Sequence, residues 1–104
     1  MPIPFVNVSS RLGSLTENTT GGYHGYRESK AALNMYTRSL AAEHRDERII
    51  AIAVSPGWVR TDMGGPDAPL APEESISGLR RVIEGLAADD SGKFLDHDGT
   101  ELAW

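Results

Sequence analysis

Residues 49–57 of the chain read Ile-Ile-Ala-Ile-Ala-Val-Ser-Pro-Gly. The first six side chains are apolar and rich in β-branched residues, and Pro56 with Gly57 ends the run. Uninterrupted apolar runs of this kind are typical of strands that are covered on both faces, as in parallel sheets. The stretch therefore predicts a buried strand over 49–54, with irregular chain after it.

Strands and helices alternate on either side of this run. Residues 3–8 predict another buried strand, and residues 26–45 are rich in helix-forming side chains that predict a helix with two buried faces. Pro72 and the acidic residues after it predict a second helix that runs to about Ala88, and residues 93–95 predict a short last strand. This alternation implies a parallel sheet with right-handed crossovers.

Composition restricts the functions that the chain can have. Its 15 acidic and 10 basic side chains give a net charge of −5, which argues against nucleic acid as a partner. It has no cysteine, so disulfides and zinc–sulfur sites are excluded, and we expect a cytoplasmic protein. No apolar run could span a membrane, and the three histidines lack the spacing of metal ligands.

Tyr26 and Lys30 are the first pair of residues with recognisable chemistry. They lie four positions apart at the start of the predicted helix, so both side chains share one helix face. A phenol is a poor proton donor or acceptor near neutral pH, and a nearby ammonium group favours the phenolate. Such a tyrosine can exchange a proton with a carbonyl or alcohol oxygen. Alone, this spacing is a weak signal, because many exposed Tyr and Lys pairs have no role.

Four segments in order strengthen the signal: Val6–Ser10, Tyr26–Leu33, Ser55–Thr61 and Gly92–Gly99. Together they resemble the short-chain dehydrogenase/reductase family, and most closely its small carbonyl-reductase-like branch. The resemblance spans essentially the whole chain, taken as one domain over 1–104. It implies an α/β fold with a partial Rossmann-like parallel sheet of about three strands and two main helices.

The resemblance also implies catalytic roles in NAD(P)-linked carbonyl or alcohol chemistry. Tyr26 would be the general acid in reduction and the base in oxidation, Lys30 would assist it and hold the nicotinamide ribose, and Ser10 would bind the substrate oxygen. The spacing between Ser10 and Tyr26 exceeds the usual family pattern, so Ser14 is a rival for the serine role. A hydrolase or dehalogenase variant of the scaffold is disfavoured by Lys30.

The cofactor, NAD or NADP, would meet this chain at its nicotinamide end. Val59 would contact the carboxamide through its backbone, and Thr61 would lie near the cofactor phosphates. The full set of implied cofactor contacts is Lys30, Pro56, Gly57, Val59 and Thr61. We expect no metal.

The family's dinucleotide-binding half has no counterpart in the sequence. That half needs a first strand, a Gly-x-x-x-Gly-x-Gly turn and a helix whose N-terminus receives the pyrophosphate, and none is present. We therefore expect a truncated, catalytic half that is weakly active or inactive alone. The alternative is a non-enzymatic module that pairs with itself or with a full-length relative through its two helices.

Overall fold

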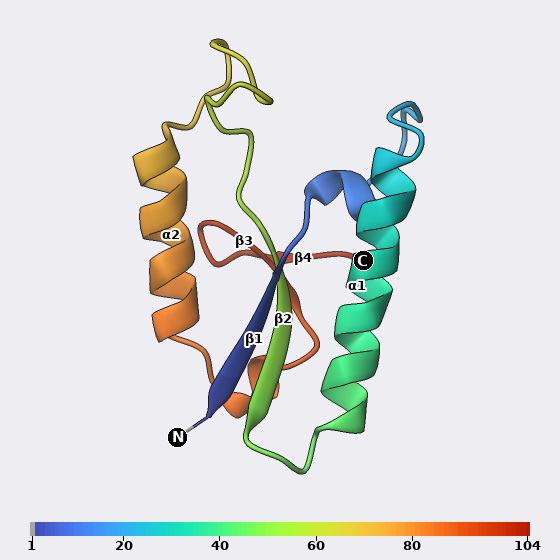
Figure 1. The fold of residues 1–104 in the computed structure, drawn as a ribbon, viewed down its shortest axis with the longest axis vertical. Coiled ribbons are helices and arrows are strands. Elements are labelled where there is room, and N and C mark those ends of the chain that lie inside the picture. Colours follow the sequence, from blue (N-terminus) through green and yellow to red (C-terminus); the bar gives the residue numbers. More distant parts are fainter. Residues whose placement is uncertain (1) are drawn as a thin grey trace.

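The computed structural model describes residues 2–104, which form a sheet with a helix on each side (Figure 1). The sheet has the strand order β1-β2-β3-β4, in which β1, β2 and β3 are parallel and β4 is antiparallel to β3. The predicted α/β class with a mostly parallel sheet is thereby confirmed. The elements in chain order are β1 (Ile3–Val8), η1 (Arg11–Gly13), α1 (Tyr26–Glu43), β2 (Ile49–Ser55), α2 (Pro72–Glu84), η2 (Ala88–Asp90), β3 (Phe94–Asp96) and β4 (Glu101–Leu102).

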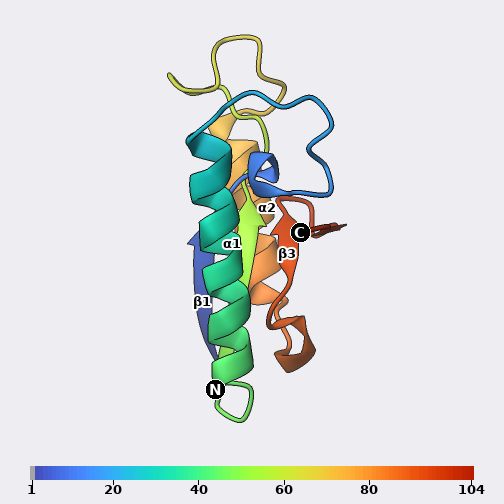
Figure 2. The same cartoon turned by 90° about the vertical axis from the view of Figure 1, so that its right-hand side faces the viewer.

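Strand β2 lies at the centre of the fold, as its sequence predicts. Its side chains alternate between the two faces of the sheet, so Ile50, Ile52 and Val54 pack toward Leu79 and Val82 of α2. The alanines at 51 and 53 face the opposite side, where α1 lies across the strands (Figure 2). Branched side chains thus fill one face of the sheet, and small ones let a helix approach the other.

Helix α1 buries one narrow stripe, so the prediction of two buried faces is wrong. The buried side chains are the small residues Asn34, Thr37 and Ala41. Met35 and Tyr36 on the outer side are 69% and 58% exposed. The reason is that α1 packs on alanines, where only a single row of small side chains fits.

Strand β1 is the edge of the sheet, and its side chains are less buried than predicted. Ile3, Phe5 and Val8 are 54%, 44% and 54% exposed, although β1 pairs with β2 along its whole length. An edge strand has a neighbouring strand on one side only, so its apolar side chains are less covered than those of a central strand. An exposed edge here was expected from the sequence, and the strand order confirms it.

The fourth strand was not predicted, because β4 has only two residues. A tight turn returns the chain after β3: the Asp96 N–H donates to the Thr100 carbonyl at 2.8 Å, and the Gly99 N–H donates to the Asp96 carbonyl at 3.0 Å. Past β4, Trp104 stacks on Phe94 with ring centroids 5.3 Å apart. The chain end thus closes the core on the α1 side.

Gly78 lies where α2 approaches the β3–β4 turn closely. An ideal Cβ at Gly78 would overlap the carbonyl oxygen of His97. Alanine improves helix propensity by about 1 kcal/mol, but overpacking costs about 1–3 kcal/mol. We expect Gly78→Ala to lower the urea midpoint with an unchanged m-value. In the control Gly85→Ala, φ is −92° at the helix end, and we expect the midpoint to stay or rise. A raised midpoint for Gly78→Ala would contradict the close approach.

Candidate active site

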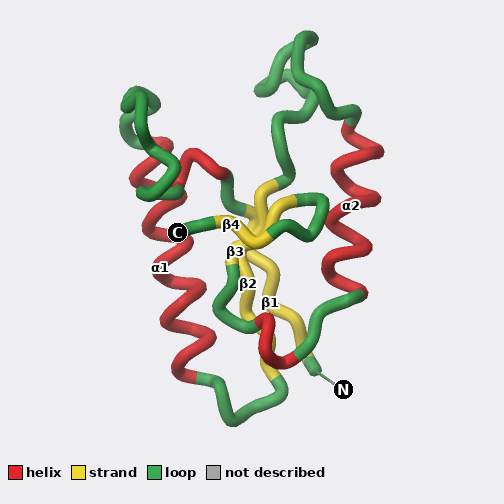
Figure 3. Tube along the Cα trace, turned by 180° about the vertical axis from the view of Figure 1, so that it is seen from behind, coloured by secondary structure: helices red, strands yellow, loops and turns green. Residues whose placement is uncertain are grey.

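The candidate residues gather where the parallel strands end. The chain leaves β1 into η1 and the loop over 14–25, and it leaves β2 into the loop over 56–71. Figure 3 shows both loops at the same end of the molecule, one above α1 and one above α2. In open α/β sheets, ligands bind in the crevice at the carboxyl ends of the strands, so this is where a site is expected.

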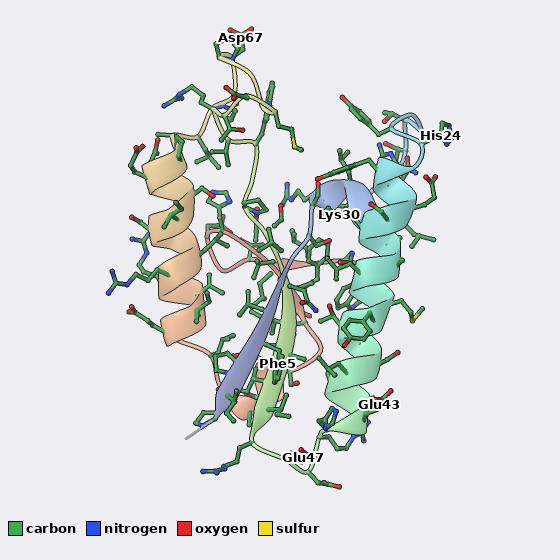
Figure 4. All side chains as sticks on the ribbon, viewed as in Figure 1. Phe5, His24, Lys30, Glu43, Glu47 and Asp67 are labelled. Atoms are coloured by element: carbon green, nitrogen blue, oxygen red, sulfur yellow. The ribbon has the colours of Figure 1, made fainter. Side chains whose placement is uncertain are left out.

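Tyr26 and Lys30 lie on the first turns of α1. The helix begins after Gly25, whose φ of +85° is left-handed and suits a residue without a side chain. The Lys30 ammonium lies 5.6 Å from the centre of the Tyr26 ring, and its Nζ donates to the Val8 carbonyl at 3.3 Å. Figure 4 shows Lys30 on the inner side of α1, toward the strands. The lysine ammonium thus lies near the tyrosine ring and is hydrogen-bonded to the end of β1.

Ser10 caps the η1 turn directly after β1. Its Oγ accepts a hydrogen bond from the Leu12 N–H at 3.1 Å. Its own hydroxyl hydrogen has no acceptor among the residues that the structure describes, so it is free to donate to a ligand. The turn packs closely on α1, because an ideal Cβ at Gly13 would lie 2.8 Å from the Cβ of Lys30.

Ser14, the rival for the serine role, is buried and occupied. Its side chain is 1% exposed. The hydroxyl donates to the Ala103 carbonyl at 2.7 Å and accepts from the Glu17 N–H at 3.2 Å. These bonds tie the loop to the chain end and use both hydrogen-bonding functions of the hydroxyl.

The residues after β2 form a turn in which part of the backbone is not covered by side chains. The Ser75 hydroxyl donates to the Pro56 carbonyl at 2.6 Å, which fixes this turn to α2. Gly57 has a φ of +83°, and a side chain there would meet Leu70 and the His97 ring. Val59 bridges to Leu70, and its own N–H donates to no residue that the structure describes.

Thr61 is turned back onto its own loop. Its N–H donates to the Val59 carbonyl at 2.9 Å, and its hydroxyl accepts from the Gly64 N–H at 3.3 Å. Among the described residues, no hydrogen bond or ion pair joins it to Ser10, Tyr26 or Lys30. The structure therefore brings Lys30 close to the Tyr26 ring and to Val8, two residues before Ser10, while Thr61 bonds within the second loop.

Arg27 organises the loop above α1, a role that the sequence did not reveal. Its guanidinium donates to the carbonyls of Leu12, Gly21 and Gly22, each at 3.1 Å, and lies 5.9 Å from the centre of the Tyr23 ring. One side chain thus fastens the loop to η1 beside Tyr26. The alternation of glycines and polar residues before Tyr26 indicated a loop, but carbonyl partners leave no trace in a sequence.

Acidic side chains stand at the N-termini of both helices. The Gly25 N–H donates to the Glu28 carboxylate, which lowers the pKa of Glu28 and keeps it negative. In α2, the Ala71 N–H donates to the Glu74 carboxylate at 3.0 Å, and Glu73 stands beside it. An anion is stabilised at a helix N-terminus by free backbone N–H groups; here the Glu28 and Glu74 carboxylates bind the N–H of the capping residue and place negative charge at both ends.

The described residues therefore fit one end of a nicotinamide cofactor only. The free Val59 N–H suits a carboxamide oxygen, Gly57 presents backbone without a side chain, and Lys30 retains donors beyond its bond to Val8. No strand leads directly through a glycine-rich turn into a helix N-terminus within residues 2–104. The pyrophosphate thus lacks its usual receptor here.

Residues 2–104 offer neither a metal site nor a helix that could span a membrane. No cluster of three or more His, Asp or Glu side chains is arranged to hold a metal ion. Neither described helix combines the length and the apolar character that a membrane crossing requires.

Comparison with known proteins gives concordant matches. A family model described as short chain dehydrogenase matches residues 5–69. The C-signal protein of Myxococcus xanthus is 52% identical over 98 residues, which are 94% of this chain and 59% of that protein. A 1-hydroxy-2-glutathionyl-2-methyl-3-butene dehydrogenase of Rhodococcus sp. (strain AD45) is 38% identical over 93% of this chain and 45% of its own length.

Solved structures agree with the sequence matches. The carbonyl reductase Sniffer of D. melanogaster superposes with a TM-score of 0.94 at 44% identity, over 97% of this chain and 41% of that one. An NADPH-bound carbonyl reductase from chicken fatty liver gives 0.89 at 39% identity, over 97% and 42%. The chain thus spans about half the length of the relatives that it matches.

Proposed function

The chain belongs to the short-chain dehydrogenase/reductase family, and we propose that it carries the proton-transfer side of an NAD(P)-dependent carbonyl or alcohol oxidoreductase. The observation that supports this most is the cluster at the end of β1. There the Lys30 ammonium lies 5.6 Å from the Tyr26 ring centre and bonds to Val8. Two residues further along, Ser10 keeps a hydroxyl hydrogen free.

Each side chain of the cluster has one task in reduction. Tyr26 donates its phenolic proton to the substrate oxygen as that oxygen becomes an alkoxide. Lys30 places a positive charge 5.6 Å from the centre of the Tyr26 ring and has donors left for a ligand. Ser10 donates a hydrogen bond to the same substrate oxygen and so holds the carbonyl in place. Ser14 cannot share this task, because its hydroxyl is buried and bonded within the fold.

A nicotinamide cofactor, when bound, supplies or accepts the hydride. The residues of this chain that would hold it are the backbone of Pro56, Gly57 and Val59, together with the Lys30 ammonium at the ribose. Thr61 belongs to the same proposal: its hydroxyl accepts from the Gly64 N–H, and its hydroxyl hydrogen can still be donated to a phosphate oxygen.

In this proposal, the described residues carry out proton transfer, and the cofactor's pyrophosphate is bound by residues outside them. Carboxylates occupy both helix N-termini, so the described residues offer no receptor for the pyrophosphate. We therefore expect the isolated chain to bind NADPH more weakly than about millimolar, which corresponds to about 4.1 kcal/mol. Isothermal calorimetry measures this directly. Clear NADPH turnover by the chain alone, with a panel of carbonyl compounds, would contradict the claim that residues outside it are needed to bind the cofactor.

A graft tests the chemistry itself. Residues 3–104 would replace the matching segment of the chicken liver carbonyl reductase, to which the chain is 39% identical. We expect this graft to oxidise NADPH in the presence of carbonyl substrates. A graft that folds and binds NADPH but has no activity would rule out the site proposed here.

The second candidate is a self-associating module without catalysis. It is favoured by exposed apolar side chains on both helices, Met35 and Tyr36 of α1 and Ile76 and Ile83 of α2, and by the uncovered edge of β1. A second copy is the occupant that we propose for these surfaces, in a cytoplasmic setting. Sedimentation of a clean monomer across the accessible concentrations would exclude it.

A further inference from the structure

We propose that the Asp96 carboxylate is a positioning residue that couples the Ser10 turn to the Gly57 turn by binding Arg11 and His97 at once. The roles of Ser10 and Gly57 rest on the proposed function, whereas the coupling itself does not. Asp96 ends β3, is 6% exposed, and has no part in the chemistry described above.

The first arm of the coupling reaches the turn that carries the serine. Asp96 Oδ2 forms an ion pair with Arg11 Nη2, at 3.2 Å. Arg11 is the first residue of η1, and Ser10 is the cap of that same turn. A buried carboxylate must be compensated by partners, so Asp96 holds Arg11, and through it the turn, against the end of β3.

The second arm reaches the turn after β2. Asp96 Oδ1 accepts from the His97 N–H at 2.9 Å and contacts His97 Nδ1 at 3.0 Å. This places the His97 ring beside Gly57, where an added Cβ would lie 3.0 Å from Nδ1. The imidazole therefore forms the wall behind the backbone that is proposed to face the nicotinamide.

The placement between the strand ends explains why one carboxylate can serve both turns. The strand order is β1-β2-β3, so the Ser10 turn and Asp96 flank the end of β2 from opposite sides. Asp96 pairs in register with Ser55, the last residue of β2, and its ion pair with Arg11 reaches the turn on the β1 side. A shift of either turn would strain an ion pair whose acidic member is buried.

A double-mutant cycle in the 104-residue chain tests the coupling by NMR. We expect Arg11→Gln to shift the Gly57 amide and His97 ring resonances, although it lies in the other turn, and to speed exchange of the Leu12 and Gly13 amides by about tenfold. In an Asp96→Asn background, the same Arg11→Gln change should leave Gly57 and His97 unmoved. Arg11→Lys, which keeps the charge, should restore most of the parent signals.

Two controls separate positioning from general destabilisation. Arg80→Gln removes an exposed arginine that forms an ion pair with Glu84 on the same helix, and it should leave the Gly57 and His97 resonances unmoved. Thermal melts of each variant detect a loss of overall stability. Equal shifts at Gly57 in both backgrounds, or none in either, would overturn the proposal. Because no readout uses catalysis, an inactive graft would count against the proposed function alone.

Discussion

Tyr26→Phe should lower kcat/KM of the graft for carbonyl reduction by about a thousandfold, within the range of general acid catalysis. The substitution removes the one group proposed to give a proton to the substrate oxygen. It keeps the aromatic ring, which lies 5.6 Å from the Lys30 ammonium. The loss should therefore fall on kcat, while the affinity for NADPH changes little.

The chain provides a matched control for this prediction. Tyr36 lies on the same helix, is 58% exposed, and has Leu40 rather than a lysine four residues further on. Tyr36→Phe should leave kcat/KM within experimental error. Comparable losses for the two variants would show that the hydroxyl of Tyr26 has no special part, and the assignment of the proton donor would fail.

The sequence predicted the elements whose pattern is set locally. The apolar run at 49–54 appears as β2, the run at 3–8 as β1, and Pro72 begins α2 as expected. Side-chain periodicity and proline geometry depend on a few neighbouring residues, so their effects can be predicted from one sequence. Burial is not local: β1 is exposed because it ends the strand order, which depends on what lies beside it in the sheet.

The site was predictable to a similar degree. The spacing of Tyr26 and Lys30 fixes their shared helix face, and α1 does begin at Tyr26. The contacts that hold the turns were not predictable, because Arg27 binds three carbonyls and Asp96 binds residues from two turns. His97 lies in the turn after β3, and nothing in the sequence indicated that its ring would lie against Asp96 and Gly57. One sequence shows side chains but not the backbone atoms that they meet.

Phe94→Ala should cost about 3–5 kcal/mol of unfolding free energy, the range for truncating a buried aromatic side chain. Phe94 is 0% exposed and packs against Ala53, Leu102 and the ring of Trp104. The free energy of unfolding of a domain of this size is about 5–15 kcal/mol in total, so the variant would lose about a fifth of its stability or more. The midpoint in urea and the thermal midpoint should both fall, with near-UV circular dichroism reporting the Trp104 environment.

The other phenylalanine makes this a test of how the chain exists in solution. Phe5 lies on the β1 edge and is 44% exposed, so Phe5→Ala should cost a monomer about 1–2 kcal/mol at most. A partner covering β1 would bury Phe5, raise that cost toward the value for Phe94, and make the thermal midpoint depend on protein concentration. If Phe94→Ala costs much more unfolding free energy than Phe5→Ala, and this difference does not depend on protein concentration, the result supports a monomer with an open edge. If the two costs are similar, and become more similar as the protein concentration rises, the result supports self-association. The measured stability would then include the interface that Phe5 helps to form.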